Sequence, residues 1–174
     1  MLKLPLNLVA GALLAALCGP AWSGAYEDMI RAIGMDDQRS VASLLKRGVD
    51  VDSVVAPDGD TLLILAAKEG KAGLVKLLLG ARPKVNARNR HGETALMFAS
   101  FHGHADVVKQ LLGQGAEVNQ SGWTPLMYST VHNRTDIARV LLGKGAQVNA
   151  QTDTGITALM MAAREGQRVQ LEIV

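Results

Sequence analysis

Apolar residues follow two different patterns along this chain. An unbroken apolar run occupies residues 8–18, and the rest of the chain carries short apolar groups at helical spacing. One such group lies at 96–99 and the next at 107–112, and similar pairs recur before and after them. Neither helix of such a pair could bury its apolar face alone, so the pattern predicts helical units that stack on one another.

The apolar run near the start is typical of an export signal. Lys3 is the only charge before it, and small residues follow near Ala21 and Ser23. Its eleven residues are too few to cross a bilayer, which needs about 20. We therefore expect residues 1–23 to be a signal peptide cleaved after Ser23, and cleavage after Ala21 or Ala25 fits the same pattern.

Two other interpretations of this segment compete with the signal peptide. Cys18 could carry a lipid, although Leu17 is bulkier than the residue that lipoprotein signals place there. The segment could also be a buried first helix, which Gly19-Pro20 would end abruptly. Export predicts a periplasmic or secreted protein, and the absence of cysteine from residues 24–174 suits an oxidising compartment.

Two series of short motifs repeat along residues 24–174. Gly-x-Thr recurs with its threonine at steps of 33, 30 and 33 residues. A Val-Asn pair follows each Leu-Leu pair after seven or eight residues, and Val51-Asp52 takes its place in the first unit. Two independent series that share one period indicate a repeat architecture. The threonines are Thr61, Thr94, Thr124 and Thr157.

Each repeat has the signals of a helix, a turn, a second helix and an extended finger. Thr94 can cap the first helix by accepting from backbone N–H groups two or three residues on. Gly103 can end that helix, because glycine adopts the left-handed conformation without cost. The second helix carries the Leu-Leu pair and stops near Gly113.

These motifs resemble the ankyrin repeat, most closely at Gly122–Leu126 and Gly145–Asn149. The resemblance implies an all-α solenoid of helix-turn-helix units joined by hairpin-like fingers. It divides the domain at 24–174 into an N-terminal capping repeat, three full repeats and an incomplete last repeat. Their ranges are 26–55, 56–88, 89–118, 119–151 and 152–174.

Several positions depart from the family pattern. A histidine is expected after the cap, and an apolar residue replaces it in each of the four repeats, so we expect apolar packing there. Arg82-Pro83 stands where Gly-Ala is expected, which predicts an altered turn or a left-handed non-glycine residue. Asn133 replaces a helix-ending glycine, which the geometry tolerates. The replacements for the histidine are Ile64, Met97, Met127 and Met160.

The finger between Asn119 and Thr124 lacks three residues relative to its neighbours, so we expect it to be blunted. The last repeat lacks the Leu-Leu and Val-Asn portions. Either the chain continues in a longer form, or another molecule, including a second copy, covers that apolar end.

Composition and charge exclude several classes of function. The chain has 18 Lys+Arg against 16 Asp+Glu, without the basic face of a nucleic-acid-binding protein. One cysteine excludes a disulfide scaffold and a cysteine-rich zinc site. The four histidines lack any nucleophile, metal or phosphate motif, so we expect no enzyme and no cofactor. Gly103-His104 matches a family motif whose histidine is expected to pack locally.

We expect a protein-binding module whose partner is an unidentified protein, with no nucleic acid and no membrane contact after signal cleavage. By resemblance, its variable positions lie on the fingers and at the ends of the first helices. The finger positions are Asp58, Asp60, Arg90, His91, Glu93, Ser121, Trp123, Asp153, Thr154 and Ile156. The helix-end positions are Lys68, Glu69, Phe101, His102, Val131, His132, Arg164 and Glu165.

Only 3% of the residues are aromatic, which makes each aromatic position informative. Phe101 and Trp123 are expected on the binding surface, because tryptophan is enriched in binding hot spots. Trp123 could instead fold back over the shortened finger and fill a gap. Phe98 and Tyr128 are expected to face the core.

Two alternatives to this function stay open. One is copper handling, because three methionines share one repeat position and thioethers with imidazoles suit Cu(I). The other is a secreted effector that binds a host protein, in contrast to an assembly or protective factor for a periplasmic enzyme.

Overall fold

The fold is a stack of paired helices. The computed structural model describes residues 21–164 and 166. Within this part of the chain nine helices follow one another, with one isolated antiparallel bridge between Val54 and Thr61. The helices are α2 (Ala21–Gly34), α3 (Gln38–Lys46), α4 (Leu62–Lys68), α5 (Ala72–Gly80), α6 (Ala95–His102), α7 (Ala105–Gly113), α8 (Pro125–Val131), α9 (Thr135–Gly143) and α10 (Ala158–Arg164).

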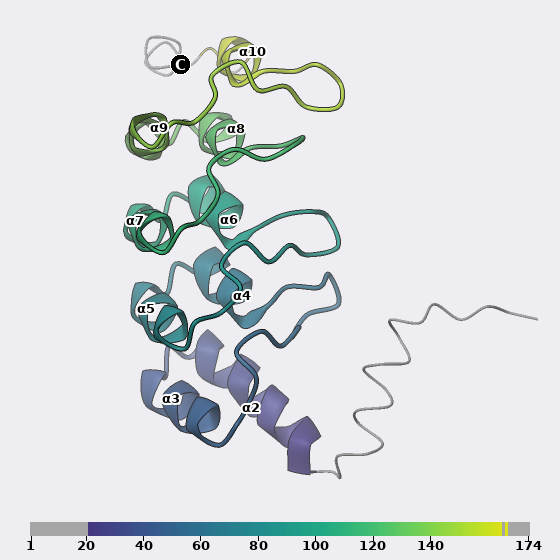
Figure 1. The fold of residues 1–174 in the computed structure, drawn as a ribbon, viewed down its shortest axis with the longest axis vertical. Coiled ribbons are helices and arrows are strands. Elements are labelled where there is room, and N and C mark those ends of the chain that lie inside the picture. Colours follow the sequence, from purple (N-terminus) through teal and green to yellow (C-terminus); the bar gives the residue numbers. More distant parts are fainter. Residues whose placement is uncertain (1–20, 165, 167–174) are drawn as a thin grey trace, which may run out of the picture.

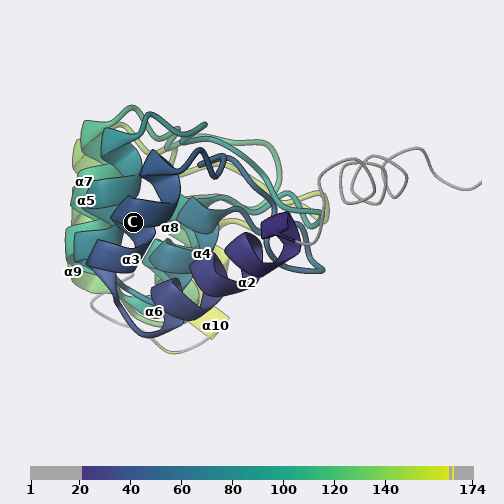
Figure 2. The same cartoon turned by 90° about the horizontal axis from the view of Figure 1, so that it is seen from below.

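The helices form two columns with the fingers beyond them. Helices α3, α5, α7 and α9 make one column, and α2, α4, α6, α8 and α10 make the other (Figure 1). Seen along the stack, the first helices lie between the second helices and the fingers (Figure 2). The all-α solenoid predicted from the repeats is confirmed.

Small residues let the first helices approach one another closely. Ala66 in α4, Ala99 in α6 and Ala162 in α10 are fully buried, and Ser129 takes the equivalent buried position in α8. Leucines of the second helices complete each layer, as Leu111 and Leu141 do. Because each layer contacts only its neighbours, the core is one continuous column.

The predicted helix starts are confirmed. The hydroxyl of each repeat threonine accepts a hydrogen bond from the backbone N–H three residues on, at 3.2–3.4 Å. Ile64, Met97 and Met127, which replace the expected histidine, are buried, so apolar packing does occupy those positions. Met160 differs, since 57% of its surface is exposed.

The predicted left-handed residues are also confirmed. Gly103 has a φ of 87°, and Asn133 takes the same role in the next unit with a φ of 52°. Arg82 has a φ of 57°, the left-handed conformation of a non-glycine residue that its place in the loop predicted.

Asparagines of the Val-Asn series join each unit to the next. The Asn119 side chain donates to Gly145 O and accepts from the Gln147 N–H, both at 2.8 Å. Asn86 makes the equivalent pair of bonds with Gly115 O and the Glu117 N–H. An amide side chain suits this position because it can donate and accept at once.

Asn119→Ala is therefore expected to lower the free energy of unfolding by about 1–3 kcal/mol, the contribution of two hydrogen bonds. Gln147→Ala is the matched control, because it keeps the backbone N–H that Asn119 accepts from. Urea denaturation followed by circular dichroism measures both. Equal midpoints for the two variants would contradict this role of Asn119.

The two ends of the described stack differ from its middle. Helix α2 begins at Ala21, so the last three residues of the predicted signal peptide are helical, and its first 20 lie outside the described residues. At the other end, Leu159 and Met160 of α10 are exposed. The segment predicted to be inserted at 168–170 lies outside the described residues. None of the helices between residues 21 and 164 is long and apolar enough to cross a membrane.

Candidate functional site

Six rings from two neighbouring units form a continuous series along two first helices, the residue that caps one of them and the finger before it. Successive centroids lie 6.4 Å apart for Phe98–His102, 5.0 Å for Phe101–His102, 4.2 Å for Phe101–His132 and 5.9 Å for Phe101–Tyr128. Trp123 extends the series, with its ring 5.2 Å from that of Tyr128. We call these six residues the aromatic strip: Phe98, Phe101, His102, Trp123, Tyr128 and His132.

Helical spacing explains why these rings meet. Phe98, Phe101 and His102 are three and four residues apart on α6, so they share one face of that helix. Tyr128 on α8 and His132, which caps that helix, are four residues apart. Stacking α8 on α6 then places the two sets side by side.

This arrangement corrects the prediction that Tyr128 faces the core, and it confirms core packing only in part for Phe98. Phe98 packs partly against core residues, yet its ring also stacks on His102 and lies 5.1 Å below the Lys68 ammonium. Tyr128 is half-buried between Phe101 and Trp123. Both residues therefore belong to the aromatic strip.

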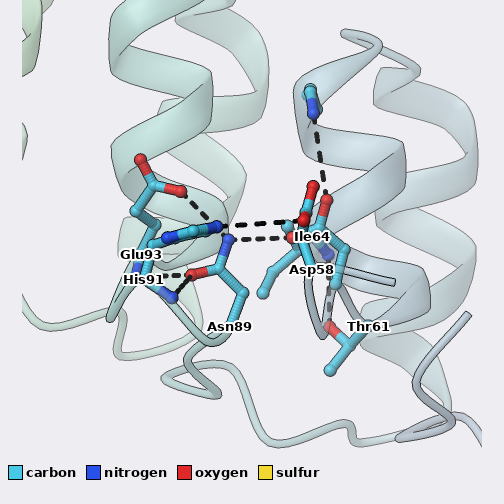
Figure 3. Close-up of polar contacts among 8 residues, drawn as sticks. Asp58, Thr61, Ile64, Asn89, His91 and Glu93 are labelled. Carbon is cyan, nitrogen blue, oxygen red and sulfur yellow. Dashed lines mark hydrogen bonds and ion pairs between the residues drawn. The ribbon is translucent and has the colours of Figure 1, made fainter. Parts of the chain in front are cut away.

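A chain of polar groups runs beside the strip through three units. Asn89 donates to Asp60 at 2.9 Å and to Glu93 at 3.0 Å (Figure 3). The Tyr128 hydroxyl donates to the other oxygen of Glu93 at 2.8 Å, and the Lys68 ammonium lies 3.9 Å from Asp60. Burial raises the pKa of Tyr128, and the bond to Glu93 raises it further, so the hydroxyl stays protonated and remains a donor.

Asp60 does not lie on the open finger surface, which corrects its prediction as a contact residue. Its surface is only 3% exposed, and its carboxylate is engaged by Asn89 and Lys68. Sequence reasoning missed Asn89, which also accepts from the His91 and Glu93 N–H groups and so shapes its own finger.

The other predicted finger residues are exposed to different degrees. Asp58, Arg90 and His91 are exposed, Glu93 is half-buried, and Trp123 and Ile156 expose 43% and 37% of their surface. Trp123 contacts Tyr128 but is not buried by the shortened finger. Of the remaining finger positions, Ser121, Asp153 and Thr154 are exposed.

The predicted helix-end residues also differ in exposure. Glu69, His102, His132 and Arg164 are exposed, whereas Lys68, Phe101 and Val131 are half-buried. Glu165 lies outside the described residues. Burial lowers the pKa of His102, and positive charge on His104, Lys68, His132 and Arg134 lowers it further.

His104 and Arg134 reach back to the preceding unit. The Nε2 atom of His104 lies 3.2 Å from Lys68 O, and the Nε atom of Arg134 donates to Phe101 O at 3.5 Å. His104 also packs locally as predicted, since its ring stacks on that of His102 with centroids 5.9 Å apart, and the contact with Lys68 O is an additional one. His104 and Arg134 each directly follow the left-handed residue that ends the first helix of their unit. This shared repeat position is the sequence feature that could have predicted the contact with the preceding unit.

The site offers surfaces for recognition. Among the described residues, no group of three or more His, Cys, Asp or Glu side chains could hold a metal ion. Of the three methionines considered for copper, Met97 and Met127 are buried and Met160 is exposed. A row of half-exposed rings with a polar chain beside it can bind apolar, aromatic and cationic groups.

Comparison with known protein families gave one match along most of the chain. The family model described as ankyrin repeats, in three copies, matches residues 29–121 and 117–174. The comparison with curated proteins gave no match.

Proposed function

Because this chain belongs to the ankyrin-repeat family, whose repeats are non-catalytic modules that bind other proteins, we propose that it recognises its partner through the aromatic strip and the fingers beside it. The observation that carries this proposal is the continuity of the strip. Six rings, each within 6.4 Å of another, join two units on one side of the stack.

The chemistry of the strip supports this surface. Aromatic side chains give large contact areas and have few rotatable bonds, so ordering them on binding costs little entropy. Ring contacts and the Tyr128–Glu93 hydrogen bond already hold the strip in place. A partner would therefore meet a surface that is formed before binding.

Affinity capture with the full chain tests this surface. Phe101→Ala combined with Trp123→Ala is expected to weaken partner binding by about 30-fold or more, the effect of losing one hot spot of about 2 kcal/mol. The control variant, Met35→Ala with Val54→Ala, removes two exposed apolar side chains outside the strip. If both double variants recover the same proteins equally well, the proposed surface is wrong.

The melting temperature of the single variant Trp123→Ala distinguishes a contact residue from a gap filler. Lost binding at an unchanged melting temperature supports a contact role. A large fall in the melting temperature would assign Trp123 to packing.

Export of the protein is the second part of this proposal. The charge, apolar run and small residues of the 1–23 segment support it, as does the absence of cysteine from residues 24–174. Fractionation of the source cells tests it. Retention in the periplasm favours an assembly or protective factor, release into the medium favours an effector, and recovery in the cytoplasm contradicts export.

A further inference from the structure

The end of the aromatic strip at Trp123 combines exposed rings with nearby carboxylates. Trp123 is 43% exposed and lies on the shortened 119–124 finger, where it contacts the Tyr128 ring. The neighbouring 86–94 and 149–157 fingers are longer, and the 119–124 finger ends short of both in Figure 1. Trp123 is therefore presented between two fingers that extend beyond its own.

A carboxylate approaches this ring pair from each neighbouring finger. Glu93 accepts from the Tyr128 hydroxyl at 2.8 Å. On the other side, Asp153 is exposed, and a Cβ placed on Gly122 would lie 3.9 Å from its Oδ1 atom. Residues 119–124 themselves carry no charge.

Two of the three basic residues of the 86–94 finger, Arg90 and His91, contact the preceding finger, and the third, Arg88, is exposed. The Arg90 side chain packs on Gly59, with its Cγ 3.1 Å from a Cβ placed there, and the Arg90 backbone N–H donates to Asp58 O at 2.8 Å. The Nε2 atom of His91 lies 3.8 Å from an Asp58 oxygen. Arg90 and His91 therefore lie against the 52–61 finger, whereas Glu93 accepts from the Tyr128 hydroxyl.

Three other basic side chains lie at the opposite end of the strip. His132 contacts Phe101, and the Arg134 guanidinium is held by Phe101 O. Lys68 lies over Phe98. The strip is thus electrostatically asymmetric, with carboxylates beside Trp123 and basic groups beside Phe98 and Phe101.

We propose that Trp123, Tyr128, Glu93 and Asp153 form a subsite for an arginine or lysine side chain in a basic segment of the partner protein. This inference rests on the proposed protein-binding function. A cation over a tryptophan face is attracted by the ring, and flanking carboxylates add to that attraction. A neutral apolar group would cover this negative charge without bringing a positive charge beside it, and a phosphate would be repelled.

Titration of the full chain with short peptides tests the subsite. A Trp22→Phe background leaves Trp123 as the single indole, whose NMR cross-peak reports binding directly. Tetra-arginine is expected to shift this peak with saturation at low ionic strength, and tetra-glutamate is expected to leave it unchanged. An equal response to tetra-glutamate, no response to tetra-arginine, or a saturable response to oligouridylate would overturn the proposal.

Charge-removing variants test which carboxylates act. Asp153→Asn is expected to weaken tetra-arginine binding about fivefold, the effect of one partly exposed ion pair. Asp136→Asn removes the same charge from α9 and is expected to leave the affinity unchanged. Equal affinities for the two variants would refute the subsite.

The subsite and the proposed function can fail separately. If Phe101→Ala with Trp123→Ala loses the partner while Asp153→Asn and tetra-arginine have no effect, the strip binds protein but the cation subsite is wrong. If the double variant keeps its partner, the proposed function itself fails.

Discussion

Met127→Ala is expected to lower the free energy of unfolding by about 2–5 kcal/mol, whereas Met160→Ala changes it by less than about 0.5 kcal/mol. The two methionines occupy the same repeat position, three residues after the capping threonine. Met127 is completely buried, and Met160 exposes 57% of its surface. The same substitution therefore leaves a cavity in one layer and none in the other.

Urea denaturation gives the free energies for both methionine variants. Comparing the two variants also tests whether apolar packing takes the place of the histidine expected at this repeat position. A large loss at Met127 supports apolar packing as the contribution of the position where a histidine is expected. If both variants lose equally little free energy of unfolding, neighbouring side chains fill the space that Met127 leaves. Met127 would then contribute little to stability.

Gly70→Ala is expected to destabilise the fold by about 2–3 kcal/mol, while Gly113→Ala stabilises it by about 0.5–1 kcal/mol. Gly70 has a φ of 68°, and an added Cβ would lie 2.5 Å from the His104 ring. That ring would have to move and give up its contact with Lys68 O. Gly113 is the last residue of α7 and has open space around its Cα.

Melting temperatures and urea midpoints check this pair of glycine variants, which share one chemical change. Opposite signs are the expected result, because alanine favours the helix at Gly113 and opposes the left-handed conformation at Gly70. A neutral Gly70→Ala variant would show that His104 is not needed to join the units.

Periodicity predicted most of the architecture, because each repeat signals its own start and end. The threonine caps, the left-handed Arg82 and Asn133, and the short 119–124 finger all follow from local sequence. These features depend on residues close together in the chain. A sequence can therefore indicate them before any contact between units is known.

Contacts between units explain what the sequence did not predict. Asp60 is buried because Asn89 of the next finger reaches it. Tyr128 joins the strip because Glu93 of the preceding finger accepts from its hydroxyl. The first helices α4, α6, α8 and α10 have only seven or eight residues, so periodicity alone does not separate their core face from the face beside the fingers.

The short 119–124 finger has a consequence for how a partner aligns with the array. A stack of equivalent units offers the same surface at each repeat, so an elongated partner could dock at several positions shifted by one unit. One finger that differs in length and carries the exposed Trp123 removes this equivalence. A partner matched to that finger has a single docking register, and a shift by one repeat would place its contacts against a longer finger instead.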